Sequence, residues 1–282
     1  MPETIDVERM GHINHVAADY NQAIGFYRRV FDVDVFREWS EGEFGTRNAL
    51  WLLGPAGFEL FGVADDQLAL GQWVAKQGQG WHSVEWTVPD LDAAAEAATA
   101  RNIRVITVPG RDLVFTHPRD LHGLCLELTA TRWDADSREQ PGWEPRYWRD
   151  EHPLRICGGP LVSVASDHPE QAAADLARLT GREVRRVDLM AVNGVSYVID
   201  FPDHSLAFAG SRTGVTSDMI GRFVAERGQR VFSLTLFTSD FQEARAYLTG
   251  LGVPFRQFGR GSLFISQEAA SGALIEIRQA NG

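Results

Sequence analysis

Apolar and polar residues alternate along several short stretches of the chain, a period that is typical of β-strands with one buried face. In the first half these stretches lie at residues 11–18, 34–39, 47–53, 57–62, 82–88, 103–107, 112–116 and 123–129. Apolar residues recur at helical spacing from Ala23 to Val30 and again just after Asp90. Asp19 and Asp90 stand where helix N-caps belong. The pattern predicts two successive modules with the order β-α-β-β-β.

The sequence nearly repeats itself, which extends this plan to the second half. Residues 73–91 match residues 223–241, and the last strands at 124–128 and 273–277 also correspond. Weaker matches join residues 11–19 to 159–167 and residues 57–62 to 205–210. A repeat of this length indicates a second copy of the architecture. We therefore predict an α+β fold of four βαβββ modules in two paired-module domains, residues 1–130 and 157–282, with a connector at residues 131–156.

The two copies differ in their ionisable residues. His12 aligns with Pro160, Glu59 with Ala207 and His82 with Phe232, whereas Glu127 aligns with Glu276. Because the apolar framework is kept while these polar side chains are lost, we expect the chemistry to reside in the first half. The second half is expected to be structural.

Composition and charge narrow the class of protein. The 282 residues include 23% charged residues and carry a formal net charge of -11, which disfavours nucleic acid and anionic membrane surfaces as partners. Cys125 and Cys157 are too few for a disulfide framework, and no apolar signal segment or spanning helix is apparent. We expect a cytoplasmic globular protein, and a homodimer is left open.

Three segments resemble the vicinal oxygen chelate superfamily, which includes glyoxalases, bleomycin-resistance proteins and extradiol dioxygenases. They are H-I-N-H-V-A-A-D-Y-N-Q-A-I-G-F-Y from residue 12, G-W-H-S-V-E-W-T-V-P-D-L-D-A-A from residue 80 and V-F-T-H-P-R-D-L-H-G-L-C-L-E-L from residue 114. The first half is most similar to methylmalonyl-CoA epimerase and glyoxalase I. The second half resembles the superfamily only as a degenerate copy.

The resemblance implies a divalent metal ion, Zn, Fe, Mn, Ni or Co, held in the cleft of a module pair. Its ligands would be two His residues on first strands and two acids on last strands, and imidazole with carboxylate suits all of these metals. By position these ligands are His12, Glu59, His82 and Glu127.

In the strand that begins near His82, two sets of residues could face the cleft. His12 lies seven residues before Asp19, but the residue seven before Asp90 is Ser83. Strict alternation turns Ser83 and Glu85 toward the cleft and His82 away from it. A bulge at the strand start can turn His82 inward. Otherwise Glu85 takes the place of the missing ligand.

Four further residues are candidates for binding the substrate, namely Asn48, Trp51, Ser83 and His15. In some epimerases the strand at residues 46–53 supplies another acid, where this chain has Asn48. His15 has the opposite parity to His12, which favours packing or a supporting role.

The resemblance implies that the metal binds a carbonyl or enediolate of a small oxygen-chelating substrate, while Glu127 or Glu85 moves the proton. Our first hypothesis is therefore an isomerase, epimerase or lyase. An extradiol-type Fe(II) dioxygenase using His12, His82 and Glu127 is the second. A metal-free small-molecule-binding protein of the bleomycin-resistance type is the third.

Overall fold

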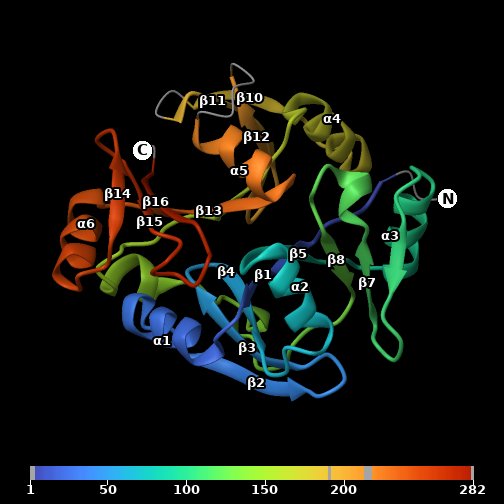
Figure 1. The fold of residues 1–282 in the computed structure, drawn as a ribbon, viewed down its shortest axis with the longest axis horizontal. Helices are drawn as coiled ribbons and strands as arrows, with labels where there is room; N and C mark the ends of the chain where they lie inside the picture. Colours follow the sequence, from blue (N-terminus) through green and yellow to red (C-terminus); the bar gives the residue numbers. More distant parts are fainter. Residues whose placement is uncertain (1–3, 190–191, 213–217, 281–282) are drawn as a thin grey trace. The chain divides into compact units, whose positions relative to one another are not determined.

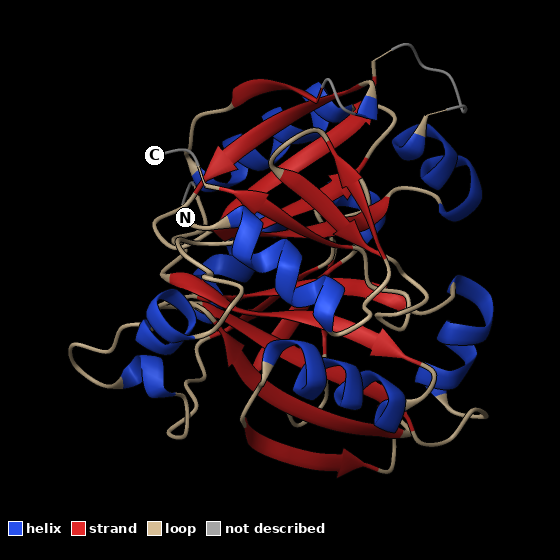
Figure 2. Ribbon diagram, turned by 90° about the vertical axis from the view of Figure 1, so that its left-hand side faces the viewer, coloured by secondary structure: helices blue, strands red, loops and turns tan. Residues whose placement is uncertain are grey.

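The computed structural model describes residues 4–189, 192–212 and 218–280, which form two mixed β-sheets of eight strands each, with helices lying against them (Figures 1 and 2). Each sheet joins two modules of β-α-β-β-β order through the first strands of both. The predicted α+β class and its four paired modules are confirmed.

The first sheet has the strand order β2-β3-β4-β1-β5-β8-β7-β6. Its strands are β1 (Arg9–Ala17), β2 (Val35–Glu41), β3 (Thr46–Leu53), β4 (Ala56–Val63), β5 (Gly80–Thr87), β6 (Val105–Thr107), β7 (Leu113–Thr116) and β8 (Leu126–Thr129). The helices are α1 (Tyr20–Phe31), α2 (Ala69–Gln77) and α3 (Leu91–Thr99), with a short 3-10 turn at Pro118–Leu121.

The second sheet repeats this order as β10-β11-β12-β9-β13-β16-β15-β14. Its strands are β9 (Leu161–Ala165), β10 (Arg185–Leu189), β11 (Gly194–Asp200), β12 (Ser205–Ser211), β13 (Arg230–Thr238), β14 (Phe255–Phe258), β15 (Ser262–Ile265) and β16 (Ile275–Gln279). The helices are α4 (Pro169–Thr180), α5 (Met219–Arg227) and α6 (Phe241–Gly250), and the connector contains short helical turns at Ser137–Glu139 and Tyr147–Glu151.

Side-chain caps fix where the module helices begin. The Asp19 carboxylate accepts a hydrogen bond from the Gln22 N–H, and the Asp90 carboxylate accepts one from the Ala93 N–H. Both bonds satisfy N–H groups that have no partner within the helix. The caps therefore stand at the predicted positions, directly after β1 and β5.

Helices α2 and α5 were not predicted. The repeated stretches begin within these helices, at residues 73 and 223. The repeat therefore showed that the two segments correspond, but not that they are helical. Each is nine residues long, and each precedes the first strand of the next module.

Contacts divide the chain into two compact units of three segments each. One unit comprises residues 1–11, 83–132 and 161–232 and holds the second and third modules. The other comprises residues 12–82, 133–160 and 233–282 and holds the first and fourth modules. The predicted domains, residues 1–130 and 157–282, correspond to the two sheets and not to these units, and this division remains a prediction.

Among the described helices, none is both long and apolar enough to cross a membrane.

Candidate metal centre

His12 and Glu59 face the same side of the first module. Strands β1 and β4 are parallel, with Asn14 as the partner of Glu59, and His12 lies two residues before Asn14 on the same face. Both His12 and Glu59 are buried, and His12 Nε2 lies 2.9 Å from Glu59 Oε2. Glu59 is not one of the three donors described below, so its predicted role as a ligand stays a prediction. A carboxylate at this distance can orient an imidazole, an arrangement that is common around histidines that bind metal.

Glu85 and Glu127 occupy paired positions on neighbouring parallel strands. They are register partners on β5 and β8, and each side chain is almost fully buried. The negative charge of Glu127 also contributes to raising the pKa of the buried Cys125 thiol to about 12, behind the larger effect of burial itself. Two buried carboxylates on one face repel each other, and a divalent cation or a shared proton relieves that repulsion.

Gly11 brings the Glu85 carboxylate up to strand β1. A Cβ atom at Gly11 would lie 1.9 Å from Glu85 Oε1, so the carboxylate fills the space that any other residue would occupy. His12 follows directly in the chain. The glycine thus allows Glu85 to lie beside the histidine. The only hint of this role in the sequence is a glycine within a strand, directly before a candidate ligand.

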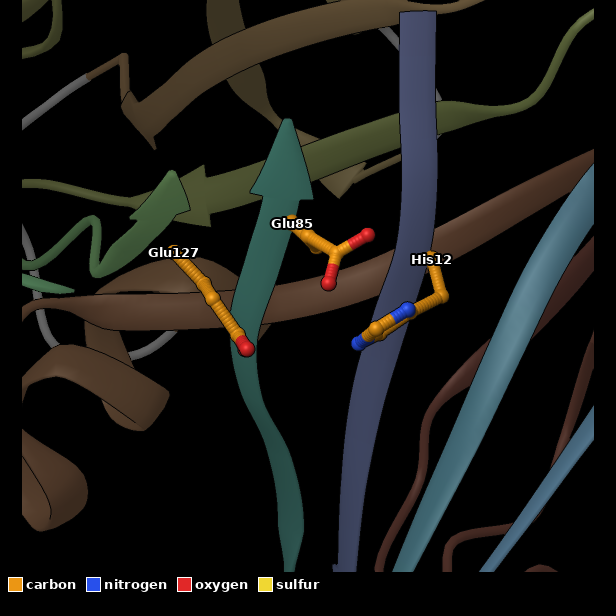
Figure 3. Close-up of side chains that lie close together, drawn as sticks. All are labelled: His12, Glu85 and Glu127. Carbon is orange, nitrogen blue, oxygen red and sulfur yellow. The ribbon is translucent and has the colours of Figure 1, made fainter. Parts of the chain in front are cut away.

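His12, Glu85 and Glu127 together form a three-donor group (Figure 3). Each offers one ligand atom, and these atoms all lie within 4.8 Å of one another. Two ligands on one zinc ion are at most about 4.4 Å apart, so the donors are already close to the spacing that a single ion needs. Imidazole with two carboxylates suits zinc and the divalent transition metals.

On β5 the structure places Glu85, and not His82, with the other candidate ligands. His82 is not part of the three-donor group, and its ring instead contacts Trp73 and Phe61, at centroid distances of 5.0 and 6.4 Å. Ser83 is fully buried and shares the parity of Glu85. Alternation therefore holds along β5, and the placement of His82 among the ligands is not reproduced.

Asn48 lies on the same face as Glu59. On β3 it is two residues from Leu50, the register partner of Glu59, so the Asn48 and Glu59 side chains point the same way. Asn48 is 1% exposed, and its Oδ1 atom has no hydrogen-bond partner in the described part of the chain.

His15 and Trp51, two of the predicted substrate-binding residues, lie away from the three-donor group. His15 has the opposite parity to His12, its Nδ1 is 3.0 Å from the Tyr27 hydroxyl and its Nε2 is 3.0 Å from the Ser271 carbonyl oxygen. Burial lowers the pKa of His15 to about 4. Trp51 is fully buried and stacks on Phe58. Both residues belong to the core between strand and helix.

The equivalent position in the second sheet is satisfied by protein groups. Glu276 is the register partner of Thr235, as Glu127 is of Glu85. Its carboxylate accepts hydrogen bonds from the Thr235 and Ser262 hydroxyls and from Arg278, whose Nη2 lies 2.6 Å away. An arginine thus supplies the positive charge that a cation would supply in the first sheet.

Comparison with known proteins shows the family of the chain. Residues 10–180, more than half of the chain, match the model of the glyoxalase-like domain family. The chain belongs to this family. Its fold and its relatives place the glyoxalase-like chain in the vicinal oxygen chelate superfamily, as the sequence motifs predicted.

Proteins that are similar to the glyoxalase-like chain include enzymes. It is 26% identical over 129 residues to mitochondrial methylmalonyl-CoA epimerase from Dictyostelium discoideum, covering 42% of this chain and 78% of that protein. It is 28% identical over 136 residues to the Mus musculus epimerase, covering 45% and 76%. The whole fold is similar to that of a mutant of 4-hydroxymandelate synthase from Streptomyces coelicolor, with a TM-score of 0.72, 12% identity and coverage of 100% and 94%.

Proposed function

We propose that the chain is a divalent-metal-dependent isomerase or epimerase that moves a proton on the carbon next to a carbonyl group of a small substrate. The observation that carries the proposal is the three-donor group of His12, Glu85 and Glu127, buried beside Glu59. The similarity of the first two modules to methylmalonyl-CoA epimerases supports the same reaction class.

The chain's own residues have distinct tasks. Glu59 holds the His12 imidazole in one orientation. When bound at His12, Glu85 and Glu127, a divalent cation supplies positive charge that polarises a carbonyl oxygen and acidifies the adjacent C–H. Burial of all these side chains keeps bulk water away from the reacting atoms.

Proton transfer needs a carboxylate in or beside the metal site that accepts a proton and returns it. Glu127 and Glu85 are the candidates, because they are adjacent and face the same side. One carboxylate takes the proton from the substrate carbon, the C–H electron pair moves into the adjoining C–C bond, and the carbonyl π pair moves onto oxygen. Return of a proton to the opposite face of that carbon gives the epimer. If that carbon bears a hydroxyl group, return of the proton to the neighbouring carbon, with the hydroxyl proton passing to the former carbonyl oxygen, gives the isomer. A lyase reaction would begin with the same abstraction.

The donor set favours this reaction over an Fe(II) dioxygenase. The 2-His-1-carboxylate site of such enzymes requires a second histidine. The three-donor group has one histidine and two acids, and His82 contacts aromatic rings instead.

The first test is metal content. Protein purified without chelators and reloaded with Zn, Fe, Mn, Ni or Co in turn should retain about one equivalent of at least one metal by mass spectrometry. His12→Ala and Glu127→Gln should each lose most of it, since each removes a ligand. Glu276→Gln is the matched control, because it changes the equivalent glutamate in the second sheet, and it should keep its metal.

The second test is proton exchange. Loaded protein in D₂O should incorporate deuterium next to the carbonyl of methylmalonyl-CoA or of the hemithioacetal of methylglyoxal and glutathione, read by mass spectrometry. With enough metal added to refill the weakened site, whichever of Glu85→Gln and Glu127→Gln still fails to exchange identifies the proton carrier. If the wild-type protein retains none of the five metals, the proposal is wrong and the chain is better described as a metal-free binding protein.

A further inference from the structure

Arg37 of β2 lies against two indole rings. Its Cζ atom is 4.1 Å from the Trp133 ring centroid and 5.3 Å from the Trp39 ring centroid. The two rings are 6.1 Å apart and inclined by 34°. Trp133 begins the connector segment of the compact unit that also contains Arg37 and Trp39, so this aromatic pair joins the connector to the edge of the first module.

Strand register places Arg37 on the face of the sheet that carries Glu59. Arg37 is the partner of Leu50 on β3, Leu50 is the partner of Glu59 on β4, and Glu59 is the partner of Asn14 on β1. Partners across neighbouring strands point to the same side. The four residues therefore form one row across the sheet, and three strand spacings put the Cα atoms of Arg37 and Asn14 at most ~14 Å apart.

The guanidinium of Arg37 has N–H groups that could bind an anion. Contact with the face of an indole ring uses one flat side of the guanidinium and leaves N–H groups in its plane, which can bind a carboxylate or a phosphate through two parallel hydrogen bonds. Within the described residues, Arg37 forms no hydrogen bond or ion pair with a protein group, and its side chain is exposed. By contrast, Arg47 stacks on Tyr20 but donates to the Glu38 carboxylate at 2.9 Å.

Buried polar atoms near this row also lack partners. Asn48 is the register partner of Trp39 and points to the same side, and its Oδ1 atom has no hydrogen-bond partner among the described residues. The same holds for the buried Nε1 atom of Trp133. Buried polar atoms of this kind are normally satisfied by water or by a ligand.

We propose that Arg37, Trp39 and Trp133 form a subsite for an anionic group, a carboxylate or a phosphate, at the far end of the substrate. The substrate is then an elongated acid with a carbonyl head at the three-donor group and an anionic tail at Arg37. Leu50, the buried neighbour of Arg37 in the row, would lie beside the apolar middle of such a molecule. The assignment of the head rests on the proposed function, whereas the subsite itself rests on the register and the contacts of Arg37.

Tryptophan fluorescence tests the subsite without turnover. Titration of the metal-loaded protein with inorganic phosphate and, separately, with succinate should give saturable quenching by at least one anion, and the anion that binds more tightly identifies the phosphate or the carboxylate as the tail. Arg37→Gln should weaken this binding by about tenfold or more, as expected when charged hydrogen bonds are lost. Arg47→Gln, the matched control on the same module, should change the affinity by less than about twofold. Trp133→Phe should lose most of the quenching.

Two results would overturn the subsite. One is the absence of saturable quenching with both anions, and the other is an equal loss of affinity in Arg37→Gln and Arg47→Gln, which would mean that any surface charge has the same effect. Because the measurement reads binding alone, a protein that fails to exchange protons can still bind anions at Arg37. A protein that exchanges protons but shows no anion binding would leave the proposed function standing and remove the subsite.

Discussion

Gly11 shows how one missing side chain can shape a site. Glu85 Oε1 occupies the position next to a Cβ at Gly11, and this oxygen is the end of a flexible side chain, so Gly11→Ala should displace the carboxylate and leave the backbone in place. We expect metal affinity to fall by about tenfold or more, while the free energy of unfolding changes by less than about 1 kcal/mol. Metal titration and urea unfolding measure the two quantities.

Gly25→Ala is the control for this substitution. Gly25 lies in α1 with nothing near its would-be Cβ, so alanine there should raise stability by about 0.5–1 kcal/mol and leave metal binding alone. Unchanged metal affinity in Gly11→Ala would show that the position of Glu85 is immaterial to the site.

His15 makes stability depend on pH. Its pKa is lowered by burial to about 4 in the folded protein, against about 6.5 in the unfolded chain. As pH falls below 6.5 the unfolded chain takes up the proton first, so the folded state loses up to about 3 kcal/mol between pH 6.5 and pH 4. Above pH 6.5 this residue contributes no slope. Urea unfolding over this range should show the decline.

His15→Gln removes the titrating group and should flatten part of that decline. Some slope should remain, since burial also lowers the pKa of His152 to about 4. If the variant and the wild-type protein show the same slope, protonation of His15 does not contribute to acid unfolding.

At the scale of the strand, the alternation of side chains between the two faces predicted much of the candidate site. Positions of one parity along β5 place Glu85 beside Glu127, and positions of the other parity place Trp86 against Phe201. His12 and Glu127 could be named as candidates because they lie in the motifs that resemble the superfamily, and Glu59 could be named from its place on the last strand of the first module. The Gly11 contact and the pairing of Arg37 with Trp133 could not be named, because each joins segments that are far apart in the chain.

Two substitutions on β5 separate the register readings. Glu85→Gln should lose most of the bound metal, since an amide is a much weaker ligand than a carboxylate, whereas His82→Ala should keep it. Metal content of the two purified variants is the measurement. The reverse result would mean that the strand start turns His82 inward when metal is bound.

For the molecule as a whole, the repeat places equivalent glutamates, Glu127 and Glu276, in the two sheets, and in the second sheet an arginine neutralises the charge. Arg278 lies against Glu276 in the second sheet, so Arg278→Ala should leave a buried carboxylate with only hydroxyl partners. We expect a loss of about 2 kcal/mol or more in the free energy of unfolding. Metal binding in the first sheet should be unaffected.

The double variant Glu276→Gln/Arg278→Ala provides the check. Removing the charge together with its partner should recover most of the lost stability, because a neutral amide costs less to bury than a carboxylate. A single Arg278→Ala variant as stable as the wild-type protein would show that hydroxyl groups alone suffice for Glu276.

The three-donor group draws on β1, β5 and β8, strands that open and close the sequence of the first two modules. An unfolded chain would hold these donors far apart and have little affinity for a metal ion, so the proposed ion would bind only after both modules have folded and paired. A ligand that binds only the folded chain raises stability by mass action. Metal supply would then set how long each molecule survives against proteolysis, as well as how fast it works.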